Sequence, residues 1–209
     1  MTAHDYIEKI NDLRYHKEYM VYPRSQPLEY NIPLEDEIIN LIKYYNVTRE
    51  ENRASGGSPY FLLQLVYRTQ ITCESINPLM IIDYSILVNG AIPVATTTEV
   101  YSTFVINVRT KEIELWVNET IAPMYKPEIT RCALNGEKFL DASYRLFYEY
   151  IEFWKNYSGN PNKFGKKLHA HMVKNIPVFA KVAGSNDYQD FWGLCVEWGC
   201  YQGIPFKQY

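Results

Sequence analysis

The stretch from Val100 to Trp154 constrains the fold of this chain more than any other, because it joins two strand patterns to one long helix pattern. Apolar residues recur at every second position on both sides of a polar turn at 109–112. This period predicts two strands, 102–108 and 112–117, paired as a hairpin. The residues expected on the inner face of the hairpin are Phe104, Ile106, Val108, Ile113, Leu115 and Val117.

A long amphipathic helix is expected after the hairpin and the loop that follows it. Asn135 is a favourable N-cap residue, and apolar residues then recur at steps of three and four, which is the helical period. The positions concerned are Phe139, Leu140, Tyr144, Phe147, Ile151 and Trp154. We therefore expect a helix over 136–155 that packs across one face of the hairpin.

The remaining segments place this unit inside a larger sheet. Helices are expected in the N-terminal segment 1–50, strands follow one another over 60–117, and further helices occupy 136–202. No helix between the strands is long enough for a parallel crossover, which favours antiparallel pairing. A chain of 209 residues can form one large domain. The sequence thus predicts a single α+β domain with a central antiparallel β-sheet flanked by helices.

Weaker patterns surround the hairpin. Leu79 to Leu87 is apolar enough for a buried strand, and Ile92 to Thr98 alternates as a partly exposed edge strand does. The segment 118–134 contains prolines and is predicted to be a loop.

At the start of the second N-terminal helix, the run Glu35-Asp36-Glu37 is better explained by the helix dipole than by acid–base chemistry.

The charge of the chain is unevenly distributed. The net charge of −3 excludes a protein whose whole surface is built for nucleic acid, so nucleic acid is not the partner expected first. However, no acidic residue lies between Glu152 and Asp187, where six lysines occur: Lys155, Lys163, Lys166, Lys167, Lys174 and Lys181. The segment Lys163–Lys181 is either a solvated helix face or a contact for phosphate groups, and both interpretations stay open.

No residue pattern in the chain predicts a catalytic centre, a metal site or a cofactor. The four cysteines lack zinc spacing, and Cys195 beside Glu197 has no histidine that would position it as a nucleophile. Buried, structural thiols are expected instead. His169 and His171 point in different directions if they lie on a helix, so they cannot readily bind one ion.

The location of the protein is predicted from two segments. The N-terminus carries no signal-peptide pattern, and the most apolar run, Leu79 to Val88, is too short to span a bilayer. We therefore expect a cytoplasmic protein with reduced thiols and no contact with the membrane. The chain is 15% aromatic and contains 19 Tyr, a composition that favours recognition surfaces without proving them.

Residues Glu112, Glu114 and Trp116 form the candidate partner-binding site. If the apolar residues of the hairpin face the core, alternation places these three on the opposite face. An exposed Trp flanked by carboxylates would suit a basic protein surface, with the Trp supplying desolvated contact area. The same Trp is equally well explained as covered by an N-terminal helix, and the sequence leaves the two alternatives open.

Three pieces of the sequence together carry a family resemblance. The first is the strand–turn–strand run Phe104–Trp116, and the second is Ala133–Leu140, in which a small residue and an Asn precede a helix with a Phe. The third is Ser185-Asn186-Asp187 followed by Phe191-Trp192-Gly193-Leu194. These pieces resemble the SUKH superfamily of bacterial immunity proteins. Members commonly carry a glycine in the hairpin turn, where this chain has Thr110-Lys111.

The resemblance implies an α+β domain that binds and neutralises a polymorphic toxin, a nuclease in some cases, and it carries over no active-site residues. The function expected from it is a non-enzymatic, immunity-type protein that occludes the active site of a cognate toxin. Two alternatives stay open. One is an enzyme or ligand-binding protein that acts on a phosphorylated or nucleic-acid substrate through the Lys163–Lys181 segment. The other is an adaptor domain without a toxin partner. The identity of the toxin and the oligomeric state do not follow from the sequence.

Overall fold

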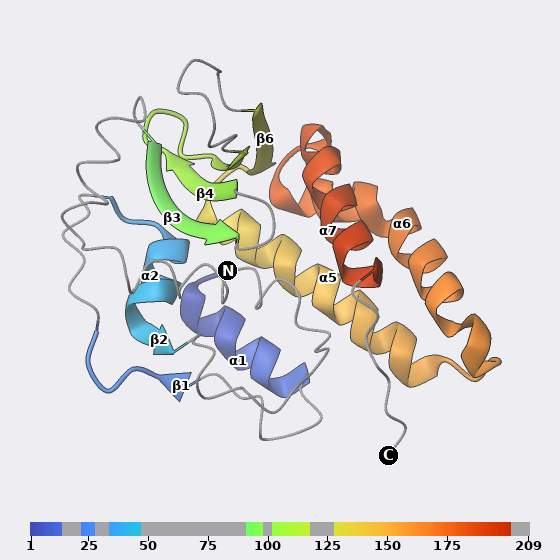
Figure 1. Ribbon diagram of the computed structural model, residues 1–209. Helices are drawn as coiled ribbons and strands as arrows, with labels where there is room; N and C mark the ends of the chain where they lie inside the picture. The colour runs from blue at the N-terminus through green and yellow to red at the C-terminus, as the bar shows by residue number, and fades with distance from the viewer. Residues whose placement is uncertain (14–21, 28–33, 47–90, 98–101, 118–127, 202–209) are drawn as a thin grey trace.

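The computed structural model describes residues 1–13, 22–27, 34–46, 91–97, 102–117 and 128–201, and all structural statements concern these residues (Figure 1). Their elements, in chain order, are α1 (Ala3–Leu13), β1 (Tyr22–Pro23), α2 (Glu37–Tyr44), β2 (Tyr45–Asn46), β3 (Ala91–Thr97), β4 (Ser102–Asn107), β5 (Ile113–Val117), β6 (Glu128–Ala133), α5 (Gly136–Asn156), η3 (Pro161–Lys163), α6 (Phe164–Ala183), η4 (Asn186–Tyr188) and α7 (Gln189–Tyr201). The predicted strand at Leu79–Leu87 lies outside the described residues.

The predicted hairpin is confirmed at the centre of an antiparallel sheet with the strand order β3-β4-β5-β6. Strands β4 and β5 pair in a register that runs from Ser102 opposite Val117 to Ile106 opposite Ile113. A separate two-stranded ribbon joins β1 and β2. The protein therefore combines helices with an antiparallel sheet, as the succession of strand patterns predicts.

The two outer strands differ in how well the sequence predicts them. Among the described strands β3 lies at the edge of the sheet, as expected, and its Pro93 lies beside a bulge, where a residue without an N–H is tolerated. Strand β6 occupies part of the segment predicted to be a loop, so that prediction is wrong for Glu128–Ala133. A register shift opposite Ile113 and Glu114 leaves both Cys132 and Ala133 buried, which breaks the alternation by which strands are recognised.

The hairpin turn contains the only described residue other than glycine with a positive φ. Lys111 has φ 68, in the left-handed region, and its N–H donates to the Asn107 carbonyl at 2.7 Å. The Asn107 side-chain oxygen also accepts from the backbone N–H of Arg109 at 3.0 Å. A tight turn of this kind favours glycine at the left-handed position, because a Cβ atom crowds the backbone there.

Helix α5 is confirmed almost to the residue. The Asn135 side chain accepts a hydrogen bond from the Lys138 N–H at 3.0 Å, and the helix then runs from Gly136 to Asn156. Phe139, Leu140 and Phe147 of its apolar stripe pack into one core with the inner face of the hairpin. Trp154, expected at the end of the stripe, is 37% exposed. The buried inner residues are Phe104, Ile106, Ile113 and Leu115. Val108 was expected among them, but it follows the end of β4 and 41% of it is exposed.

Four aromatic rings from three distant segments meet in this core. Phe104 of β4 lies with its ring centroid 5.9 Å from that of Phe139 on α5, and 5.8 Å from that of Phe191 on α7. The neighbouring Trp192 lies 5.9 Å from Phe139, and its indole N–H donates to the Cys132 carbonyl of β6 at 3.1 Å. These edge-to-face and tilted contacts join sheet and helices into one apolar layer.

The acidic run before α2 serves helix termini, as predicted. Asp36 caps α2, because its side chain accepts from the Ile38 N–H at 2.8 Å, and it also accepts from the Gly136 N–H at the start of α5 at 3.0 Å. Glu37 accepts from the Ala3 N–H at the start of α1 at 2.6 Å. Three helix N-termini thus converge on two carboxylates, where exposed N–H groups and the helix dipole favour negative charge.

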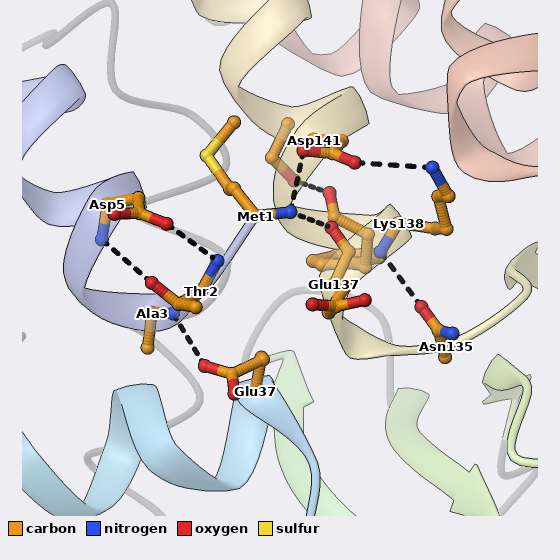
Figure 2. A network of polar contacts seen from close by, with 11 residues as sticks. Met1, Thr2, Ala3, Asp5, Glu37, Asn135, Glu137, Lys138 and Asp141 are labelled. Carbon is orange, nitrogen blue, oxygen red and sulfur yellow. Dashed lines mark hydrogen bonds and ion pairs between the residues drawn. The ribbon is translucent and has the colours of Figure 1, made fainter.

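The same region holds the start of the chain against α5 (Figure 2). The amino group of Met1 lies 2.8 Å from a carboxylate oxygen of Asp141, whose other oxygen lies 3.6 Å from Lys138 Nζ. The N-cap bond from Lys138 to Asn135 is visible beside this pair. These contacts fix α1 across the first turns of α5.

The C-terminal helices cover the sheet beyond α5. Helix α6 packs against both α5 and α7 and forms the outer margin of the helical layer (Figure 1). It ends before Gly184, where φ is 118 and the N–H donates to the Lys181 carbonyl at 3.1 Å. Pro177 does not end the helix, and it lies on an exposed side. A short turn, η4, then leads into α7.

Candidate interaction surfaces

The face of the hairpin opposite the main core is occupied by Glu114 and Trp116. The Trp116 indole N–H donates to Glu114 Oε2 at 2.8 Å, and the side-chain amide of Asn107 donates to Glu114 Oε1 at 3.0 Å. The exposed fractions are 8% for Trp116 and 5% for Glu114, and Trp116 packs on Val105. Of the two alternatives that the sequence leaves open for Trp116, the exposed anchor is the wrong one, because the ring is buried and its N–H is already bonded within the hairpin.

Glu112 lies apart from this pair. Arg131 of β6 donates to its carboxylate through Nε at 3.1 Å and through Nη2, and the Tyr188 hydroxyl of η4 donates to it at 2.9 Å. The Arg131 guanidinium also lies over the Tyr188 ring, 5.2 Å from its centroid. The structure thus brings Glu114 and Trp116 together but directs Glu112 to another element. The expectation of three residues on one open face fails because Glu112 precedes β5 and only 9% of it is exposed.

The contacts of Glu112 change its proton affinity and that of its neighbour. Burial alone raises the pKa of the Glu112 carboxyl, but the hydrogen bonds from Arg131 and Tyr188 outweigh that effect, so the pKa lies below its usual value. For Tyr188, burial and the hydrogen bond to Glu112 raise the pKa to about 12. At neutral pH the three side chains therefore form a charged, hydrogen-bonded network that joins the start of β5 to β6 and η4.

Cys132 and Cys195, in the described part of the chain, are buried and form no disulfide. Burial raises the pKa of the thiols of Cys132 and Cys195 well above the usual value. A nucleophilic cysteine needs the opposite shift, because the thiolate is the reactive form. The expectation of structural thiols is confirmed for these two residues.

The histidines of α6 point to different helices, as the spacing predicts. His169 Nε2 lies 2.8 Å from a carboxylate oxygen of Glu197 on α7, and His171 Nε2 lies 3.0 Å from one of Glu149 on α5. Each imidazole therefore bridges α6 to a neighbouring helix. Within the described ranges, no group of three His, Cys, Asp or Glu side chains is arranged to hold a metal ion.

The outer side of α6 carries a row of lysines that the sequence indicated only as a segment. The row has five lysines, all of them exposed, and within the described part of the chain none of them forms an ion pair. We call them the lysine face: Lys163, Lys166, Lys167, Lys174 and Lys181. Lys155 differs, because it lies 3.8 Å from Glu152 on α5. Lys167, Lys174 and Lys181 are seven residues apart and therefore share one side of α6, Lys166 lies next to Lys167, and Lys163 is the N-cap of the helix. The spacing alone could have indicated this grouping.

The chain was also compared with known proteins. No protein-family model, no curated protein and no solved structure matches it. Among the helices that the structure describes, none combines the length and the apolar character needed to cross a membrane.

Proposed function

We propose that the chain is a non-enzymatic binding protein of the immunity type, which neutralises a cognate bacterial toxin by binding it and blocking its active site. The observation that supports this most is the aromatic cluster of the core. Each of the three sequence pieces that resemble the SUKH superfamily contributes a ring to it, namely Phe104, Phe139 and the pair Phe191 and Trp192. Pieces that resemble one family and also pack on one another are expected if they belong to a common scaffold.

The hairpin turn also supports the resemblance. Members commonly have a glycine in this turn, and Lys111 has the left-handed backbone conformation for which glycine is suited. The chain thus keeps the geometry of such a turn although it lacks the glycine. A departure in sequence at this position is therefore compatible with the same hairpin.

The use of the polar side chains favours binding over catalysis. The carboxylates of Glu112 and Glu114 are hydrogen-bonded inside the protein, and the two histidines of α6 bridge helices. Each of these groups already has a structural partner. In this proposal the chain acts as a preformed scaffold that meets its partner with little change of shape.

The toxin-binding residues have to differ from those expected from the hairpin pattern. Glu112, Glu114 and Trp116 are buried, so in this proposal they support the surface from beneath. Arg131 is the exposed end of the network that it forms with Glu112 and Tyr188, which hold its guanidinium in place. A fixed, partly exposed arginine is a frequent source of binding energy in protein interfaces. We therefore propose Arg131 as a contact residue, with Glu112 and Tyr188 as positioning residues.

The proposal predicts that a large secreted toxin is encoded directly upstream of this chain, and co-expression with that toxin tests it. Cells that produce the toxin alone should stop growing, and cells that also produce this chain should recover. The toxin with an inactivated active site serves as the growth control. If the chain is folded and abundant but gives no protection, the immunity function is wrong.

A further inference from the structure

We propose that the lysine face of α6 binds the phosphate backbone of nucleic acid. This inference does not depend on the immunity function, because it uses a different part of the molecule. It begins from the placement of the five lysines on one exposed side of a helix whose opposite side is buried. Leu168, Met172, Phe179, Ala180 and Ala183 hold that opposite side in the core. The lysines therefore sit on a fixed support.

The length of the lysine face suits a linear polyanion. Lys163 and Lys181 are separated by about 27 Å along the helix, given a rise of about 1.5 Å per residue. Duplex DNA carries one phosphate charge per roughly 1.7 Å of its axis, so several phosphates lie within that span. The segment between Glu152 and Asp187 contains no carboxylate side chain that would repel them. The rest of the chain has an excess of acidic residues, so the positive charge is concentrated in this segment.

The composition of the face distinguishes nucleic acid from a protein partner. Protein interfaces are enriched in arginine and aromatic residues and depleted in lysine, whereas this face has five lysines and no arginine. Lysine acts as a point charge, which is sufficient for phosphate oxygens. The contact should therefore be independent of base sequence.

A membrane surface fits the face less well. Helices that lie on membranes present bulky apolar residues such as Trp, Phe and Leu on one side. The apolar residues exposed between the lysines are smaller ones: Ala170, Val173, Pro177 and Val178. The larger apolar residues Leu168, Met172 and Phe179 are buried in the protein core instead.

The experiment measures binding of the full chain to two labelled probes by fluorescence anisotropy. One is a duplex of about 20 base pairs, long enough to cover the ~27 Å face, and the other is a single strand of the same sequence. Salt is varied between about 50 and 200 mM, because each phosphate contact contributes about −0.9 to the slope of log K against log salt for duplex and about −0.7 for single strands. We expect a slope of up to about −4.5 for duplex.

Two variants with the same net charge separate the lysine face from the general charge of the protein. Lys167→Gln, Lys174→Gln and Lys181→Gln remove three lysines from the face. Lys9→Gln, Lys138→Gln and Lys155→Gln remove three from elsewhere, each of which contacts a described side chain. The face variant should bind at least about tenfold more weakly and lose about 2.7 from the duplex slope. The control variant should keep both the affinity and the slope.

Several results would overturn the proposal. Absence of binding by the unaltered chain to both probes at about 50 mM salt is one. Equal losses in the two variants, or no loss in the face variant, would show that the lysine face is not the site. Binding to vesicles rich in phosphatidylserine without binding to either probe would assign the face to a membrane instead. The ratio of the duplex affinity to the single-strand affinity shows which form of nucleic acid the lysine face prefers.

Discussion

Asp36 and Gly136 are 100 residues apart in the sequence, yet a carboxylate oxygen of Asp36 accepts the Gly136 N–H at 3.0 Å. The same carboxylate caps α2, so one side chain fixes the N-termini of two helices. A Cβ atom at Gly136 would lie 2.0 Å from Asp36 Oδ1. Only glycine permits this approach. Burial of the Asp36 carboxyl raises its pKa above the usual value, even though two backbone N–H groups bind it.

Gly136→Ala should therefore be destabilising, although alanine is the better helix former. We expect a loss of about 2–3 kcal/mol in the free energy of unfolding, from the collision and the disturbed cap. Urea unfolding measures it. Gly165→Ala is the matched control, because a Cβ atom there meets nothing within 4 Å near the start of α6. That variant should be neutral or more stable by up to about 1 kcal/mol. Equal effects of the two substitutions would contradict the cap geometry.

Glu112 should make the protein sensitive to acid. Its pKa is lowered in the folded protein, so its stabilising effect is complete above the pKa of the unfolded chain, about 4.3. The effect is lost as the pH falls through the folded-state pKa. Glu112→Gln should cost about 1–3 kcal/mol at neutral pH, and the difference from the unaltered chain should shrink below about pH 4. Unfolding free energies at several pH values test this. A difference that does not vary with pH would count against an ionised Glu112.

Trp116→Ala should lower the free energy of unfolding by about 3–5 kcal/mol, because a buried ring is removed. Glu114 also loses a hydrogen-bond donor. Thermal melts provide the measurement, and Trp154→Ala provides the control, since Trp154 is partly exposed at the end of α5. A small shift at Trp116, similar to that of the control, would restore the interpretation of an exposed anchor.

The sequence predicts those parts of the fold in which the period is uninterrupted. Strands β4 and β5 and helix α5 keep their two- and three-to-four-residue periods, and the Asn135 cap marks where the helix begins. Strand β6 is missed because its bulge places the adjacent Cys132 and Ala133 on the same side. A local deviation of the chain thus hides a strand from any analysis of alternation.

The candidate site was predicted less well, for a related reason. Alternation assigns Glu114 and Trp116 to one face correctly, but it cannot state whether that face is covered. Glu112 was assigned to the same face, and its contacts with Arg131 and Tyr188 come from segments that follow it by 19 and 76 residues. Such long-range contacts have no local signal in the sequence.

The turn of the hairpin offers a stabilising substitution. Lys111→Gly should raise the free energy of unfolding by about 0.5–1 kcal/mol, because it relieves a left-handed residue that carries a Cβ atom. Arg109→Gly, in the same turn but without a positive φ, should lower it by a similar amount through the entropy of the unfolded chain. Urea unfolding of both variants distinguishes the effects. Destabilisation by Lys111→Gly would show that the lysine side chain has a role beyond the turn.

The measurement that tests the proposed function most directly is a calorimetric titration of this chain with the purified, inactivated toxin that the proposal expects to be encoded directly upstream. We expect a defined stoichiometry and a Kd of about 1 nM or tighter, near −12 kcal/mol. Arg131→Lys, which keeps the charge but loses the paired donors, should weaken binding by about tenfold or more. It should also lower the melting temperature, because Glu112 loses its two hydrogen bonds from Arg131, so the titration is run at a temperature at which the variant is fully folded. If binding is retained in that variant, the contact lies elsewhere on the protein. If two folded proteins give no binding heat at several temperatures and the active toxin is not inhibited, the protein is not an immunity protein for that toxin.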